Sequence, residues 1–303
     1  MMEEYVELLK GLIAIPSFSR EETAVCDYLE QWLRSHGLDV HRKMNNVWLE
    51  QAGKGDGRPV ILLNAHLDTV RPAAGYTRDP FTPTLDGNTL YGLGSNDDGA
   101  SLVALLAAYL DLTSRPQPCR FIWCATAEEE VCGQNGIEAI IDEIGPVDLG
   151  IIGEPTGMNM AVAEKGLLVL DCVSTGVSGH AARNEGVNAL YLAMDDIDWF
   201  RNYHFEKVSQ HLGEVKMTVT IIEAGTQHSV VPVSCRFTVD VRPNGEYTNQ
   251  EIVDIIRSHV KCSVTPRSMR HNSSSISMEH PFVKAGLALG LEAFGSPTTS
   301  NQT

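Results

Sequence analysis

Short apolar runs and helical repeats alternate along the first half of this 303-residue sequence. Apolar runs bounded by glycine, proline or charged residues predict buried strands at 60–63, 120–125 and 148–152. Between them, apolar side chains at helical spacing predict a buried helix over 98–112, and a further helix is predicted around 136–144. This alternation of strand and helix is typical of an α/β fold with a mostly parallel sheet.

Two helices are predicted before the first of these strands. Apolar positions at helical spacing predict one over residues 5–13. Ser19 and Glu22 match a capping box, so a second helix is predicted to begin there and to close at Gly37. Short strands are predicted to follow around 39–43 and 47–51, before the apolar run at 60–63.

The pattern changes near Lys165. Residues 166–266 predict the order strand, helix, strand, strand, helix, strand, which is that of a ferredoxin-like sandwich. A helical pattern then returns at 281–294. We therefore expect a small α+β domain over 166–266, inserted into an α/β domain formed by 1–165 and 267–303.

Composition excludes some classes of partner. The net charge of −16 argues against a nucleic-acid-binding protein and against binding to anionic membrane surfaces. No apolar stretch reaches the roughly 20 residues of a membrane helix, and the first residues lack the basic region of a signal peptide. The seven cysteines include no CxxC pair, which favours a reduced, cytoplasmic setting.

Acidic and imidazole side chains follow the predicted strands or precede the predicted helix at 98–112. They are His66 with Asp68, Asp97, the run 128–130, and Glu154. The carboxyl ends of parallel strands share one edge of a sheet, where α/β proteins bind ligands, so these side chains are expected to converge. Each also has a structural alternative: a polar loop for His66, a helix N-cap for Asp97, a solvated helix start for 128–130, and a turn for Glu154.

Three adjacent glutamates, 128–130, favour a cation at this edge of the sheet. Carboxylates packed together oppose one another's ionisation, and a divalent cation removes that repulsion. A mixture of imidazole and carboxylate ligands is compatible with zinc, and also with manganese or cobalt.

Short motifs that resemble those of one known family follow one another in order along nearly the whole chain. They are residues 64–70, 90–97, 128–130, 153–156, 179–182, 188–189, 230–232 and 240–242. Each motif is weak alone, but the ordered series is specific. The chain resembles the zinc-dependent aminoacylase and carboxypeptidase family of the peptidase M20 type, and within it the chain is most similar to the acetylornithine and succinylornithine deacetylases.

The resemblance implies two zinc ions, with cobalt or manganese as alternatives. His66, Asp97 and Glu154 would bind one ion, and Asp97 would bridge to a second ion that Glu130 also binds. Asp68 would orient His66. Residues 1–165 and 267–303 would then be the catalytic metal-binding domain, and 166–266 the lid and dimerisation domain of a homodimer.

The resemblance also implies the reaction. Glu129 would be the general base for the water that attacks an amide carbonyl. His180 would stabilise the oxyanion, often across the dimer interface, and Arg242 would bind the substrate α-carboxylate. The expected substrate is a small N-acyl-L-amino acid, foremost N-acetyl- or N-succinyl-L-ornithine in arginine biosynthesis. Succinyl-diaminopimelate desuccinylase and a metallo-dipeptidase or carboxypeptidase are the alternatives.

The sequence departs from the family pattern in its last part. The family's final zinc ligand is a histidine near the C-terminus, whereas this sequence has no histidine after His280. We expect that the sequence is truncated within its catalytic domain, the alternative being a second metal site that is completed otherwise. A catalytically incomplete metal-binding protein is therefore the non-enzyme alternative. Asp98 also replaces the methionine usual after the bridging aspartate.

Overall fold

The computed structural model describes residues 2–302 and divides into two compact units. The first unit runs to Gly157 and takes in the last stretch from Ser300. The second unit spans Met158–Thr299. Each unit has its own hydrophobic core, so each is described separately.

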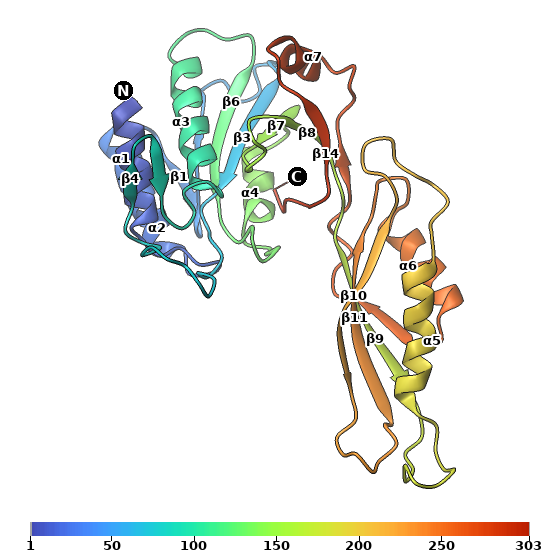
Figure 1. Ribbon diagram of the computed structural model, residues 1–303. Helices are drawn as coiled ribbons and strands as arrows, with labels where there is room; N and C mark the ends of the chain where they lie inside the picture. The colour runs from blue at the N-terminus through green and yellow to red at the C-terminus, as the bar shows by residue number, and fades with distance from the viewer. Residues whose placement is uncertain (1, 303) are drawn as a thin grey trace. The chain divides into compact units, whose positions relative to one another are not determined.

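A mixed five-stranded sheet with the order β1-β2-β6-β3-β7 forms the centre of the first unit (Figure 1). Strand β3 is parallel to both β6 and β7, whereas β2 is antiparallel to β1 and β6. This confirms the predicted α/β class. The strands are β1 (His41–Lys43), β2 (Asn46–Glu50), β3 (Val60–His66), β6 (Arg120–Thr126) and β7 (Leu149–Ile152), and β4 (Thr84–Asp86) with β5 (Thr89–Tyr91) forms a separate hairpin.

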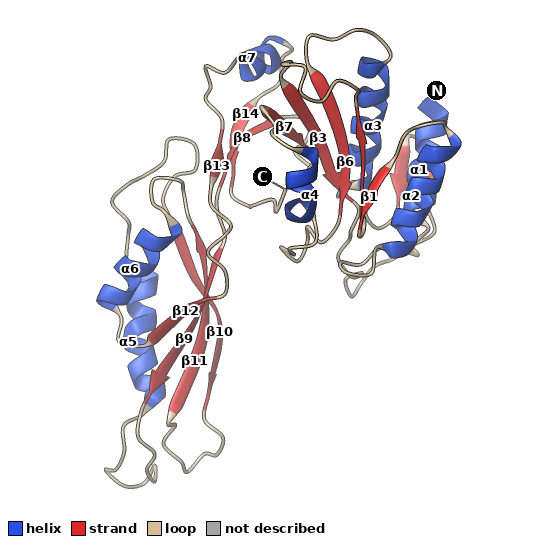
Figure 2. Cartoon of the chain, turned by 180° about the vertical axis from the view of Figure 1, so that it is seen from behind, coloured by secondary structure: helices blue, strands red, loops and turns tan. Residues whose placement is uncertain are grey.

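Helices cover both faces of this sheet (Figure 2). Leu63 and Trp123 pack with three helices on one face, while Leu62 and Ile122 pack with one helix on the other. Since successive side chains of a strand point to opposite faces, β6 is buried along its whole length. The helices are α1 (Met2–Ile13), α2 (Thr23–Ser35) and α3 (Gly99–Thr113) on the first face and α4 (Ile137–Ile144) on the second.

The second unit contains the predicted ferredoxin-like sandwich. Its four-stranded antiparallel sheet has the order β10-β11-β9-β12, and the core lies between this sheet and helices α5 and α6. Burial alternates along β9, as expected for a sheet with one covered face. The elements are β9 (Leu168–Thr175), α5 (Ala189–Asn202), β10 (Lys216–Ala224), β11 (Ser234–Arg242), α6 (Asn249–His259) and β12 (Ser263–Pro266).

The second unit extends further at both ends than the predicted domain 166–266, because it begins at Met158 and ends at Thr299. Residues 267–303 were expected to return to the first domain, but the contacts place the chain up to Thr299 in the second unit. The reason is a small sheet with the order β13-β8-β14, in which two late strands pair with β8. Its elements are β8 (Met160–Glu164), β13 (Ser274–Ser275) and β14 (Ala293–Ser296), and α7 (Pro281–Ala288) precedes β14.

Within residues 2–302, every helix is too short or too polar to cross a membrane.

Candidate metal centre

Three parallel strands deliver the candidate ligands to one edge of the first unit. His66 is the last residue of β3 and is paired with Thr126 of β6, while Asn64 is paired with Ile152 of β7. The segment after β6 therefore starts beside His66 and contains Glu129. The segment after β7 contains Glu154. The predicted convergence at the carboxyl ends of the strands is what the structure shows.

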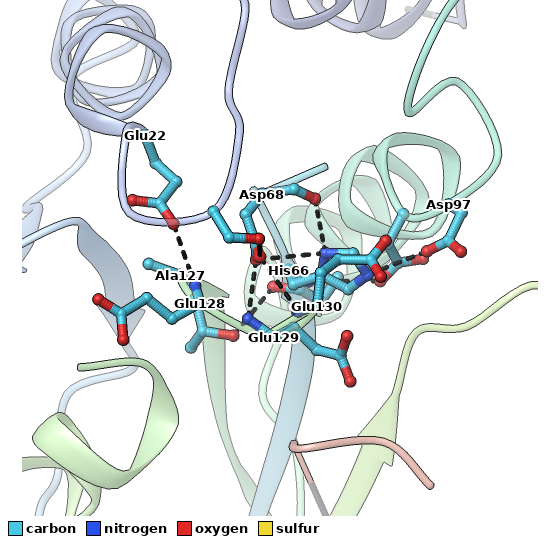
Figure 3. Close-up of polar contacts among 12 residues, drawn as sticks. Glu22, His66, Asp68, Asp97, Ala127, Glu128, Glu129 and Glu130 are labelled. Carbon is cyan, nitrogen blue, oxygen red and sulfur yellow. Dashed lines mark hydrogen bonds and ion pairs between the residues drawn. The ribbon is translucent and has the colours of Figure 1, made fainter. Parts of the chain in front are cut away.

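His66 is 1% exposed and lies between two aspartates (Figure 3). Its Nδ1 is 2.9 Å from the backbone oxygen of Asp68 and 3.5 Å from the Asp68 carboxylate, and its Nε2 is 3.0 Å from Asp97 Oδ1. Burial disfavours the charged ring, but the bonds to Asp68 and Asp97 outweigh it, so the pKa of His66 lies well above its ordinary value. Because Nδ1–H donates to a carbonyl, Nε2 is the nitrogen available to a cation.

The fully buried carboxylate of Asp68 has a second task that the sequence did not indicate. It accepts the backbone N–H of Glu129 at 2.9 Å and that of Glu130 at 3.1 Å. It also accepts the Ser19 hydroxyl at 2.7 Å. These bonds and the contact with His66 outweigh burial and lower the pKa of Asp68. The capping-box prediction for Ser19 is therefore wrong, because its hydroxyl is used here and α2 begins at Thr23.

Two groups of side chains have ligand atoms within 4.8 Å of one another. One group is His66, Asp97 and Glu130, and the other is His66, Glu129 and Glu154. All five side chains that the sequence assigned to metal binding and general base catalysis are thus brought together, although the resemblance distributes them differently between the two ions. Figure 3 shows four of them, with Glu129 and Glu130 beside His66.

The electrostatics of this cluster fit a divalent cation. Burial, together with the negative charge of Asp97, raises the pKa of Glu130 to about 7. Burial and the charge of Glu129 raise the pKa of Glu154 to about 7 as well. Burial also raises the pKa of Asp98, whose Oδ2 accepts the His66 backbone N–H at 3.3 Å, to about 6. A bound cation would relieve the mutual repulsion that these shifts express.

Glu128, the first of the three glutamates, does not belong to the centre. Its backbone adopts a φ of 57°, and its N–H donates to Glu22 at 3.2 Å. Its carboxylate accepts from Asn135 at 2.8 Å and lies away from His66 (Figure 3). Glu128 therefore shapes the turn that carries its two neighbours.

Residues that follow the second unit also reach the centre, and the sequence did not indicate them. The backbone N–H of Asn301 donates to Glu129 Oε1 at 2.8 Å. Gln302 Nε2 donates to Glu154 Oε1 at 3.2 Å, and Gln302 Oε1 accepts from Asn64 at 2.7 Å. Asn64 lies two residues before His66 on the same face of β3. This position is the one local signal in the sequence that Asn64 lies close to the centre.

His180 and Arg242 both belong to the second unit. His180 forms a bridge with Val230, and its Nδ1 accepts the backbone N–H of Ala182 at 3.2 Å. Arg242, the last residue of β11, donates from Nε and Nη2 to the Asp240 carboxylate at 2.8 and 3.0 Å.

Comparison with family models finds two matches in the chain. A model described as peptidase family M28 matches residues 46–143. The M20 model described as the peptidase dimerisation domain matches residues 162–263. The two matched segments correspond to the two units.

Relatives in sequence are hydrolases. A putative [LysW]-lysine/[LysW]-ornithine hydrolase from Pyrobaculum aerophilum is 32% identical over 250 residues, which span 78% of this chain and 65% of the relative. A succinyl-diaminopimelate desuccinylase from Rhizorhabdus wittichii is 26% identical, over 86% of this chain and 73% of the relative. The chain thus spans about two thirds to three quarters of the length of these relatives.

Solved structures share the fold. A tripeptidase from Staphylococcus aureus superposes with a TM-score of 0.76 at 19% identity, covering 99% of this chain and 85% of that protein. An M20 family metallo-carboxypeptidase from Sulfolobus solfataricus superposes with a TM-score of 0.72 at 16% identity. The match covers 99% of this chain and 86% of that protein. The chain thus has the M20 peptidase fold with its dimerisation domain, and its relatives are hydrolases, in keeping with a metal-dependent amidohydrolase.

Proposed function

We propose that this protein hydrolyses the amide bond of an N-acylated diamino acid at the cluster around His66. The observation that carries the proposal is the convergence of one imidazole and four carboxylates, in two ligand groups, near the carboxyl ends of three parallel strands of the sheet. Two zinc ions would be bound by His66, Asp97, Glu130 and Glu154, with cobalt or manganese able to replace them. Such ions supply Lewis acidity toward the carbonyl and an acidified water.

Glu129 is the general base in this proposal. Its backbone N–H is fixed by Asp68, and its Oε1 accepts the N–H of Asn301. A carboxylate with its main chain and one oxygen fixed is well placed to take the proton of the attacking water and to return it to the departing amine. Asp68 supports this role because it orients both His66 and the Glu129–Glu130 backbone.

The relatives narrow the substrate class. Their names contain diaminopimelate, lysine or ornithine, each an amino acid with a second amino group. N-succinyl-diaminopimelate is therefore a candidate substrate beside N-acetyl- and N-succinyl-L-ornithine. The net charge of −16 favours the approach of the extra amino group, which is cationic at neutral pH.

Arg242 and His180, both in the second unit, are the proposed residues for binding the substrate carboxylate and the oxyanion. The Asp240 carboxylate engages Nε and Nη2 of Arg242, so a substrate carboxylate would bind through Nη1. Asp240 also holds the guanidinium in one orientation, which favours planar recognition. His180 would donate a hydrogen bond to the developing oxyanion.

A homodimer through the second unit is part of the proposal. Tyr191, Met194 and Ile222 are exposed large side chains on α5 and on β10, which is an edge strand packed beside α5. An apolar patch next to an unpaired strand edge is suited to a second copy of the same surface.

A substrate panel tests the proposed function. The protein is stripped of metal, reloaded with zinc, cobalt or manganese, and assayed on N-succinyl-diaminopimelate, N-acetylornithine, N-succinylornithine and unmodified dipeptides. We expect metal-dependent hydrolysis, with kcat/KM for one N-acylated diamino acid at least tenfold above that for the dipeptides. Hydrolysis of dipeptides alone would refute the substrate class, and no hydrolysis by the metal-loaded protein would refute the function.

A further inference from the structure

The amide of Gln302 is buried among groups from strands β3 and β6 and from the segment after β7. Only 6% of Gln302 and none of Asn64 is exposed. Gln302 Oε1 accepts from Asn64 Nδ2 at 2.7 Å and lies 3.5 Å from the Thr126 hydroxyl. Gln302 Nε2 donates to Glu154 Oε1 at 3.2 Å, across 148 positions of sequence. One side-chain amide therefore connects the ends of β3 and β6 to a carboxylate that follows β7.

The hydrogen-bond partners of this amide select its orientation. With Nε2 toward Glu154, a donor meets a carboxylate acceptor, and Oε1 meets the Asn64 and Thr126 donors. A reversed amide would place its oxygen against a Glu154 oxygen and its N–H groups against the Asn64 amide N–H, so it would lose these bonds. The hydrogen bonds from Asn64 to Gln302 and from Gln302 to Glu154 therefore hold the Glu154 carboxylate in one position.

We propose that Gln302 is a positioning residue that holds Glu154 ready for metal binding. The proposal rests on the metal-dependent function proposed above. Residues that hydrogen-bond to a ligating carboxylate fix its rotation, and losing such a partner typically weakens metal binding by about 10- to 100-fold. The adjacent Asn301 N–H restrains Glu129 in the same way, so this short segment supports both glutamates of the group they form with His66.

The role is selective between the two ligand groups. Within residues 2–302, Gln302 makes no hydrogen bond to Asp97 or Glu130, and its contact is with Glu154. Removing the amide should therefore lower the affinity for the ion that Glu154 binds and leave the affinity for the ion at Asp97 and Glu130 unchanged. If Gln302 had a purely structural role, its removal would instead lower both affinities together and lower the stability of the metal-free protein.

The experiment compares zinc binding to the metal-free wild type and to Gln302→Met, which keeps the side-chain length and removes the amide. Isothermal titration gives the two affinities, and the visible absorption of bound cobalt reports the ligands of each ion. We expect one zinc affinity to fall about 10- to 100-fold while the other stays within about twofold. Gln302→Ala should give the same pattern. The control is Gln250→Met, because Gln250 is exposed on α6 in the second unit and contacts Asp254.

Equal zinc affinities in wild type and both Gln302 variants would overturn the proposal while leaving the metal centre intact. Equal weakening of both ions, with a lower unfolding temperature of the metal-free variant, would also overturn it in favour of a structural role. A wild type that binds no zinc would refute the metal centre of the proposed function, and the role of Gln302 with it.

Discussion

Asp68 and Glu129 are 61 positions apart in the sequence, yet Asp68 Oδ1 accepts the backbone N–H of Glu129 at 2.9 Å. The other oxygen of Asp68 accepts the N–H of Glu130 and the Ser19 hydroxyl. One buried carboxylate thus joins the end of β3, the turn after β6 and the segment before α2. The position of the proposed general base depends on this aspartate as much as the position of His66 does.

Replacing Asp68 with Asn should therefore affect both stability and turnover. The new amide nitrogen cannot accept from the Glu130 N–H, so we expect the free energy of unfolding to fall by about 1–3 kcal/mol and kcat to fall at least tenfold. Ser19→Ala removes one hydroxyl bond and should cost only about 1 kcal/mol. Urea unfolding and steady-state kinetics measure both, and a D68N variant as stable and active as wild type would contradict the assignment.

Glu129→Gln should separate catalysis from metal binding. A general base typically contributes about 10²- to 10⁴-fold, so kcat should fall by that factor while at least one zinc ion remains bound. The matched control is Glu128→Gln, because Glu128 contacts Asn135 and Glu22 rather than the centre. That variant should lose stability with kcat changed less than about threefold. Similar turnover in E129Q and wild type would exclude Glu129 as the base.

Removing the metal should destabilise the first unit. A ligand that binds only the native state at 100 times its Kd adds about 2.7 kcal/mol to the free energy of unfolding. Dialysis against a chelator should therefore lower the Tm by roughly 5–10 °C and abolish hydrolysis. Calorimetry before and after zinc is restored checks both effects, and a Tm that does not respond to zinc would argue against a metal site.

Acid should remove a contribution of Glu30 to stability. The Arg42 guanidinium, 2.8 Å from Glu30, and Arg34 hold the pKa of this carboxyl below its ordinary value in the folded state. A lowered folded pKa stabilises the protein above the unfolded pKa of about 4.5, and the contribution is lost as the pH falls through the folded value. Glu30→Gln should thus cost about 1 kcal/mol at pH 7. In urea unfolding at pH 3, the difference between variant and wild type should shrink.

Tyr191→Glu should convert the proposed dimer into a monomer. Tyr191 is 66% exposed and Met194 is 55% exposed, one helical turn apart on α5. A charge inserted into an apolar interface is costly because it loses its water without gaining a partner. Sedimentation velocity measures the change. The control is Tyr76→Glu, at a position 49% exposed in the first unit, and this variant should remain dimeric. A dimeric Y191E variant would show that the dimer interface does not include Tyr191.

Helices, strands and the candidate ligands were predictable from the sequence because each has a local signal. The apolar run at β6 is long and bounded, and His66, Glu129 and Glu154 each follow such a strand. Parallel pairing then brings them together without further information. The convergence of these side chains was thus predictable from the pattern of strands and the residues that follow them, whereas their roles as ligands and base were implied by the family resemblance.

Contacts between distant segments had no such signal. Ser19 has the spacing of a helix cap, but its hydroxyl is used by Asp68, which is 49 positions away. Gln302 lies in a polar stretch without periodicity, and its partners are in β3, β6 and the turn after β7. The strands β13 and β14 are short, so their pairing with β8, which moves the domain boundary, depends on tertiary contacts rather than on pattern.

The return of Ser300–Gln302 to the first unit determines when Glu154 gains its amide partner during synthesis. His66, Glu129 and Glu154 leave the ribosome well before Gln302, which follows Glu154 by 148 positions. At about 5–20 residues per second, the nascent chain carries Glu154 for roughly 7–30 s before its amide partner is made. The whole second unit is translated in that interval. Glu154 thus gains the hydrogen bond from Gln302 only after the second unit has been translated, so a chain still being made carries this ligand without that support.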